Sequence, residues 1–222
     1  VGAATVRLLR RLGVAVEFPA AQTCCGQPHF NSGYRGGARA LARHTIRAFA
    51  NGQAVVAPSG SCAAMVKLEY PELFHDDLVW HGRAEDLARR THELSDFLVN
   101  VLGVEDVGAR FPAKVTYHMA CHLRGLGLLT EPERLLHRVR GLEYVPLERA
   151  DECCGFGGSF AVRYPQISGA MVGDKVNFIE QAGVGAVVAT DAGCLMNIAG
   201  CLRRRGSKVR ALHLAQVLEK TS

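Results

Sequence analysis

The feature that most constrains this chain is a cysteine pattern that occurs twice. The triplet Cys-Cys-Gly stands at Cys24–Gly26 and again at Cys153–Gly155, 129 positions later. A second repeated segment begins at Ala54 as AVVAPSGSC, and its counterpart AVVATDAGC begins at Ala186, 132 positions later. Two segments that recur in the same order and at nearly the same spacing indicate an internal duplication. The fold of this chain therefore has to accommodate two similar cysteine-bearing units.

Each unit is predicted to alternate helices with short strands. Apolar residues at helical spacing favour helices, and an uninterrupted apolar run such as AVVA is typical of a buried parallel strand. The predicted helices are 6–12, 34–49, 134–139 and 164–181. The predicted strands are 14–18, 54–57, 114–118, 142–147 and 186–189, and a last strand and helix lie within 209–218. This alternation predicts an α/β fold of two duplicated βαβ units with parallel sheets, related by a pseudo-two-fold internal repeat.

The predicted division of the chain follows the duplication. Residues 1–70 form the first unit, residues 71–112 a mostly charged helical connection, and residues 113–222 the second unit. The second unit begins with a strand that leads to Cys121, whereas the first unit has no matching segment in this sequence. By symmetry we expect a further strand and a further cysteine about seven residues before Val1.

Composition and charge exclude several classes of protein. Hydrophobic residues make up 48% and charged residues 21% of the 222 positions, which is typical of a globular domain. No segment approaches the roughly 18 consecutive apolar residues that a membrane span needs, so no membrane span is expected. The net charge of +5 is scattered over short pairs and one arginine run at 203–205, so nucleic acid is not an expected partner.

The placement of the cysteines predicts metal binding. Each motif cysteine follows a predicted strand, and the carboxyl ends of parallel strands meet at one edge of a sheet. Thiolates that gather at one point suit an iron–sulfur cluster or a tetrahedral zinc ion. The second site would use Cys121, Cys153, Cys154 and Cys194, and the first, incomplete site would use Cys24, Cys25 and Cys62. A redox-active disulfide is the alternative for the motif cysteines, whereas Cys201 is predicted to be a buried core residue.

Four further side chains lie close to these cysteines in the sequence. A histidine can ligate a metal, donate a hydrogen bond to a sulfide or move a proton, and an arginine can orient a carboxylate or pair with an anionic cluster. The candidates for the surroundings of the metal are His29, His118, His122 and Arg124. The alternative for each is an ordinary role, with the side chain facing solvent or bonded to the backbone. No catalytic residue is identified.

Four motifs carry a resemblance to a known family. They are TCCGQPHFNSG at 23–33, YHMACHLRG at 117–125, ECCGFGGSF at 152–160 and TDAGCLMNI at 190–198. In this order they resemble the cysteine-rich CCG domain family, which includes a subunit of heterodisulfide reductase, glycolate oxidase iron–sulfur subunits and small proteins of lactate utilisation. The resemblance implies a cytoplasmic iron–sulfur subunit that transfers electrons while L-lactate, a 2-hydroxy acid, is oxidised to pyruvate. It also implies two partner proteins, one of which could bind the substrate.

The chain departs from part of this family at two positions. Members like heterodisulfide reductase carry a fifth cysteine three residues after the last one, where this chain has Met65 and Asn197. The departure favours a simpler four-thiolate cluster, such as 4Fe-4S, or zinc. It also motivates an alternative function, a zinc-stabilised or thiol–disulfide scaffold in a redox complex that carries no cluster of its own.

Overall fold

Two parallel sheets organise the part of the chain that the computed structural model describes, residues 1–221. A four-stranded sheet has the order β4-β3-β5-β6, and a smaller sheet pairs β1 with β2. The strands are β1 (Val55–Ala57), β2 (Thr91–Glu93), β3 (Arg110–Tyr117), β4 (Arg140–Tyr144), β5 (Ala186–Ala189) and β6 (Arg210–His213). The structure therefore confirms an α/β fold with parallel sheets.

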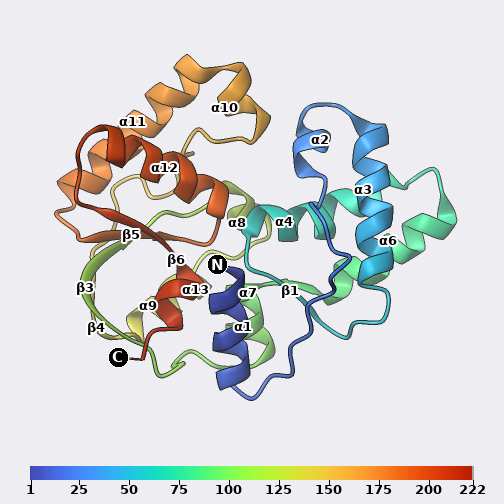
Figure 1. Ribbon diagram of the computed structural model, residues 1–222, viewed down its shortest axis with the longest axis horizontal. Helices are drawn as coiled ribbons and strands as arrows, with labels where there is room; N and C mark the ends of the chain where they lie inside the picture. Colours follow the sequence, from blue (N-terminus) through green and yellow to red (C-terminus); the bar gives the residue numbers. More distant parts are fainter. Residues whose placement is uncertain (222) are drawn as a thin grey trace.

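Helices connect the strands and cover both sheets (Figure 1). Those of the first half are α1 (Gly2–Arg11), α2 (Gln27–Asn31), α3 (Arg35–Ala48), α4 (Gly60–Ala64), α5 (Tyr70–Leu73), α6 (Leu78–Arg90) and α7 (Leu94–Asp96), with π-helical turns η1 (Met65–Glu69) and η2 (Phe97–Val101). Those of the second half are α8 (Cys121–Gly125), α9 (Glu131–His137), α10 (Ser159–Arg163), α11 (Pro165–Gln181), α12 (Ala192–Arg204) and α13 (Leu214–Leu218). No helix within residues 1–221 combines the length and the apolarity needed to cross a membrane.

Strand β5 separates two parts of the hydrophobic core. All four of its residues are buried, and successive side chains of a strand point to opposite faces. Ala186 and Val188 pack with residues of α1, α9 and α13, whereas Val187 packs with residues of α11 and α12. The four-stranded sheet thus has helices on both faces, as a continuous apolar strand requires. A third cluster lies beside the smaller sheet and joins α3, η1, α5 and α6.

The sequence-based element boundaries agree in part with the structure. The predicted helices 34–49 and 164–181 correspond to α3 and α11. The strand predicted at 14–18 is wrong, because this segment pairs with no strand among the described residues and runs as irregular backbone. Val14 and Val16 still pack against the core, so their alternating apolar pattern reflects packing and not a ladder. Strand β2, which lies in the segment predicted to be a helical connection, was not expected.

Candidate metal centre

Strands β1 and β5 each deliver a cysteine to the first turn of a helix. Ser59 precedes α4, and its hydroxyl accepts a hydrogen bond from the amide of Cys62 at 3.3 Å. Asp191 precedes α12, and its carboxylate accepts a hydrogen bond from the amide of Gly193 at 3.3 Å. Side-chain oxygens at these positions start a helix by satisfying its free N–H groups. Cys62 and Cys194 therefore stand at matching places after the two AVVA strands.

Each Cys-Cys-Gly triplet forms a turn that separates its two sulfurs. Gly26 and Gly155 have φ angles of 89° and 75°, in the left-handed region that favours glycine. The Gly26 amide donates to Cys24 Sγ at 3.5 Å, and the Gly155 amide donates to Cys153 Sγ at 3.4 Å. The first sulfur of each pair thus contacts the glycine amide of its own turn. The second cysteine interacts with the cysteine at the start of the helix that follows the next strand.

The structure brings all four cysteines of the predicted second site together. The Cys121 thiol interacts with that of Cys153, and the Cys154 thiol interacts with those of Cys153 and Cys194. Cys154 is buried, whereas Cys153 is exposed. Cys154 Sγ, Cys194 Sγ and a ring nitrogen of His118 all lie within 4.8 Å of one another. Side chains from the end of β3, from the second Cys-Cys-Gly turn and from the first turn of α12 therefore lie next to one another.

Interactions among these thiols favour ionisation of one of them. The neighbouring Cys121 and Cys154 thiols hold the pKa of Cys153 well below its usual range. Hydrogen bonding to Cys153 and burial raise the pKa values of Cys121 and Cys154 above their usual range. The thiolate is the form that binds metal, so Cys153 is the member of the set that is most ready to ligate.

Two of the three cysteines of the predicted first site are in contact. Cys25 Sγ donates to Cys62 Sγ at 3.5 Å, and this contact lowers the pKa of Cys62 to about 7, with help from the Ser59 hydroxyl. Cys25 becomes the donor, and its pKa rises. Cys24 is exposed, and its sulfur contacts the Gly26 amide. The first site therefore resembles the second in local geometry but has fewer thiols.

The two histidines beside Cys121 have different surroundings. His118 is 1% exposed, and neither of its ring nitrogens has a hydrogen-bond partner within residues 1–221. His122 Nε2 lies 3.1 Å from Gln27 Nε2, and His122 Nδ1 lies 3.6 Å from Cys121 Sγ. An amide NH₂ can only donate, so His122 accepts at Nε2 and carries its proton on Nδ1, facing the sulfur. The Nδ1–H group of His122 therefore donates to the Cys121 sulfur.

The other two candidates lie in ordinary surroundings. Arg124 is paired with Asp151 at 3.2 Å, and both side chains are exposed. His29 is exposed, and its ring packs so closely on Gly37 of α3 that a Cβ there would lie 2.7 Å from it. Roles for Arg124 and His29 next to a metal remain predictions. Cys201 is 6% exposed inside the core cluster around α11 and α12, where the sequence predicted it.

Three residues that the sequence reasoning missed join the two cysteine sets. Gln27 Nε2, besides contacting His122, donates to the carbonyl oxygen of Ser61 at 3.2 Å. Asp191 Oδ2 accepts from the amide of Ser61 at 2.8 Å, although it belongs to the other half of the chain. His213 Nε2 lies 3.1 Å from the carbonyl oxygens of both Pro58 and Thr190. Pro58 and Thr190 occupy the same position in the two repeats. This equivalence was the sequence signal that could have pointed to a contact between the two segments.

Helices α4 and α8 lie side by side at the centre of the molecule, between its two halves (Figure 1). A Cβ added at Gly60 would lie 3.3 Å from both Cβ and the amide nitrogen of Leu123. The missing side chain of Gly60 therefore lets the helices that carry Cys62 and Cys121 approach closely. This contact places the two cysteine sets near the same junction.

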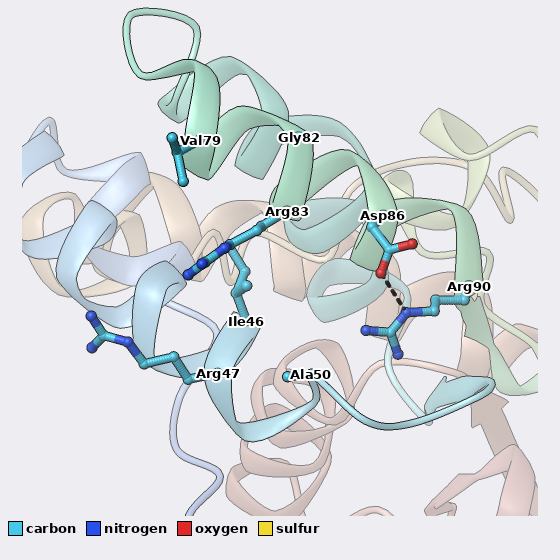
Figure 2. A pocket seen from close by; sticks show the side chains of 8 residues that line it. All are labelled: Ile46, Arg47, Ala50, Val79, Gly82, Arg83, Asp86 and Arg90. Carbon is cyan, nitrogen blue, oxygen red and sulfur yellow. Dashed lines mark hydrogen bonds and ion pairs between the residues drawn. The ribbon is translucent and has the colours of Figure 1, made fainter.

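A groove of about 590 Å³ lies away from the cysteines, between α3 and α6 (Figure 2). Its lining residues are Ile46, Arg47, Ala50, Val79, Gly82, Arg83, Asp86 and Arg90. Arg90 is paired with Asp86 at 3.0 Å, as the close-up shows. The groove contains none of the residues that the sequence predicts for a metal site.

Comparison with known proteins places this geometry in a family. Residues 1–67 and 115–199 match the model of the CCG family, which is described as a cysteine-rich domain. The chain belongs to the CCG cysteine-rich domain family. Both matched segments include a Cys-Cys-Gly turn and the strand and cysteine that follow it. The resemblance of the four motifs to this family is thus confirmed.

Several similar CCG proteins share one name. Lactate utilization protein A of Geobacillus kaustophilus is 52% identical over 219 residues, which cover 98% of this chain and 91% of the relative. The protein of the same name from Geobacillus thermodenitrificans has the same identity and coverage. That from Macrococcus caseolyticus is 50% identical over 98% of this chain and 89% of its own length. The similarity therefore extends over nearly the whole of each chain.

The donor set of the second site fits the groups that this family implies. Thiolates are the protein ligands of iron–sulfur clusters, and thiolates with a neutral imidazole also bind zinc. Burial lowers the pKa of His118 to about 4, so its ring is neutral at pH 7 and keeps a lone pair. The site can therefore bind a metal group.

Proposed function

We propose that this CCG protein is the iron–sulfur electron-transfer component of a system that oxidises L-lactate to pyruvate. The observation that carries the proposal is the continuous series of thiol interactions that joins Cys121, Cys153, Cys154 and Cys194. The printed name of its relatives, lactate utilization protein A, supports the choice of lactate as the 2-hydroxy acid. A 4Fe-4S cluster at this site is part of the proposal.

The residues of this chain would hold the group and tune it. An iron–sulfur cluster, when bound, accepts and passes on single electrons. The four cysteines would bind it as thiolates, and the Nδ1–H group of His122 would donate to Cys121 Sγ, which favours the more electron-rich state. Buried apolar neighbours of Cys154 and Cys194, among them Ile198, would keep water from the inner side of the site.

The proposal includes partners that the resemblance implies. Two further proteins would complete the system, and one of them could bind the small 2-hydroxy acid. The family resemblance alone supports a cytoplasmic location. The two cysteine sets would act together through the contact of α4 with α8, because a short separation favours electron transfer between them.

Metal analysis of the full-length protein, purified anaerobically, tests the proposal. We expect iron and acid-labile sulfide in comparable amounts and visible absorbance that bleaches on reduction. The variant Cys153→Ser is expected to lose the iron of the second site, since a thiolate ligand supplies both charge and bonds. Cys201→Ala is the matched control, because Cys201 is buried away from the site, and it should retain the iron.

A colourless protein without iron that still sustains lactate oxidation with its partners would contradict the proposal. Loss of iron from Cys201→Ala as well as from Cys153→Ser would show that the iron depends on folding and not on ligation. Retention of all iron in Cys153→Ser would remove this cysteine from the ligand set.

One observation favours a second candidate, a zinc-stabilised or thiol–disulfide scaffold. The Cys25 and Cys62 sulfurs are 3.5 Å apart, and the donors around His118 lie within 4.8 Å of one another. A tetrahedral zinc ion with Zn–S bonds of about 2.3 Å holds its thiolates about 3.8 Å apart, closer than a four-iron cluster does. About one zinc ion per site, without iron or sulfide, would favour this candidate in the same metal analysis.

A further inference from the structure

Among the buried polar side chains without a hydrogen-bond partner in residues 1–221, His118 is the one that lacks a partner at two atoms. It directly follows β3, and its amide donates to the carbonyl oxygen of Val188 at 2.8 Å, which fixes its backbone against β5. Its ring is enclosed, yet neither Nδ1 nor Nε2 has a hydrogen-bond partner within residues 1–221. Burying a polar group without a partner is costly, so a ring with both nitrogens unpaired indicates a missing partner.

The position of the ring indicates what that partner is. One ring nitrogen, Cys154 Sγ and Cys194 Sγ lie within 4.8 Å of one another, so the three atoms surround a common point. An imidazole nitrogen next to two thiol sulfurs matches the mixed nitrogen and sulfur donors that bind zinc.

The two histidines beside Cys121 differ in how their ring nitrogens are occupied. Both ring nitrogens of His118 lack a partner among the described residues. A neutral imidazole offers one lone pair, which a metal ion accepts. His122 differs because both of its ring nitrogens already have neighbours, Gln27 on one side and Cys121 on the other.

We propose that His118 is a direct metal ligand of the second site, bound through one ring nitrogen next to Cys154 and Cys194. The inference rests on the proposed function only in that the second site binds a metal, and it holds for iron or zinc. With four protein ligands at the centre, His118 then takes the place of one of the four thiolates, and the ligation is mixed nitrogen and sulfur. His122 stays outside it and acts on Cys121 through a hydrogen bond.

The test uses cobalt(II) as a spectroscopic probe in protein labelled with ¹⁵N-histidine. The full chain carries Cys62→Ser, which removes a thiolate of the first site, so that the signal reports the second site. We expect intense thiolate-to-cobalt charge-transfer bands and one strongly coupled histidine nitrogen in electron–nuclear double resonance. In His118→Ala this nitrogen coupling is lost and the affinity for cobalt falls about tenfold or more, whereas His122→Ala, the matched control, keeps the coupling.

A further variant keeps the test decisive if His118→Ala fails to fold. His118→Cys retains a ligand at the same place, so we expect bound cobalt without the nitrogen coupling and with stronger charge-transfer bands. Absence of a coupled nitrogen in the parent protein, or its persistence in His118→Cys, would overturn the proposal. Iron analysis of the anaerobically purified parent tests the proposed function separately, because iron bound without a coupled nitrogen would contradict only the role of His118.

Discussion

At β2, Glu93 places a carboxyl group in the interior, where the residue is 1% exposed. Glu93 Oε2 accepts hydrogen bonds from the amide and the hydroxyl of Ser95, whereas Oε1 has no partner among the residues that the structure describes. The buried Tyr117 hydroxyl is close enough for the carboxylate to raise its pKa further. Burial raises the pKa of Glu93 itself to about 7 from an ordinary value of 4.5. Titration of Glu93 should therefore make the stability of the fold depend on pH.

The free energy of unfolding should fall as the pH rises from about 4.5 to 7. In this range the folded protein keeps a proton on Glu93 that the unfolded chain has released, so the stabilising proton is lost as the folded group titrates. Glu93→Gln keeps an acceptor for Ser95 and carries no charge. We expect it to be more stable than the parent by up to about 3 kcal/mol at pH 8 and nearly equal at pH 4, since each pKa unit corresponds to about 1.4 kcal/mol.

Urea unfolding at the two pH values measures this difference. Glu17→Gln is the control, because Glu17 is exposed on irregular backbone, and it should change stability little at either pH. An equal effect of Glu93→Gln at pH 4 and pH 8 would contradict a raised pKa at Glu93.

At the scale of the element, the Cys-Cys-Gly turn depends on close packing as well as on backbone conformation. A Cβ at Gly155 would lie 2.8 Å from the carbonyl oxygen of Ser168 and 2.9 Å from Cβ of Met171, both in α11. The turn that carries Cys153 and Cys154 therefore packs directly against this helix. The Gly26 turn is packed less tightly, with its nearest contact at 3.3 Å, to Leu41 of α3.

Gly155→Ala is expected to lower the free energy of unfolding by about 3 kcal/mol. A left-handed backbone at a non-glycine residue costs about 1–2 kcal/mol, and the clash with α11 adds an overpacking cost of similar size. Gly183→Ala is the matched control, because Gly183 has a φ of 61° and nothing lies within 4 Å of an added Cβ. It should lose only about 1 kcal/mol. Equal losses of stability for Gly155→Ala and Gly183→Ala in urea unfolding would show that α11 shifts to accommodate the new side chain.

At the scale of the whole molecule, Asp191 and His213 hold the two halves together. Asp191 accepts hydrogen bonds from amides at the start of both α12 and α4, through different carboxylate oxygens. His213 bridges the carbonyl oxygens that end the two AVVA strands, with its Nδ1 accepting from the amide of Ala215. Burial lowers the pKa of His213, so a neutral ring with its proton on Nε2 makes these contacts. The two cysteine sets share this support.

Asp191→Ala should cost about 2–3 kcal/mol of stability, because it leaves amides of two helices without their acceptor. Asp77→Ala removes the cap of one helix, α6, where Asp77 accepts from Trp80, and also a partly exposed ion pair with Arg43 at 3.4 Å, and it should cost about 1 kcal/mol. Asp191→Asn keeps one acceptor oxygen, so its loss of stability should lie between those of Asp191→Ala and Asp77→Ala. Thermal and urea unfolding of the three variants measure the difference, and a loss at Asp191 no larger than that at Asp77 would rule out a joint role in the two halves.

Local pattern was enough to predict much of the fold. The helices α3 and α11 and the buried strand β5 are long or strongly apolar segments, whose periodicity reflects their own burial. The segment 14–18 shows the limit, because its alternating valines indicate packing but a strand also needs a neighbour to pair with. Strand β2 is the converse case, since Thr91–Glu93 has no apolar run and becomes a strand only by pairing with β1. The duplication of the two units stays a prediction.

The sequence by itself determined the family, the α/β class and the cysteines that could gather, because these depend on residue types and spacings along the chain. Only the tertiary structure decided how their neighbours are used. His118 and His122 are both close to Cys121 in the sequence. His118, directly after β3, is buried, whereas His122, in α8, contacts Gln27. Asp191 joins Ser61 across 130 positions. Hydrogen bonds and burial are set by distance in space, and spacing along the chain does not fix that distance between residues of different halves.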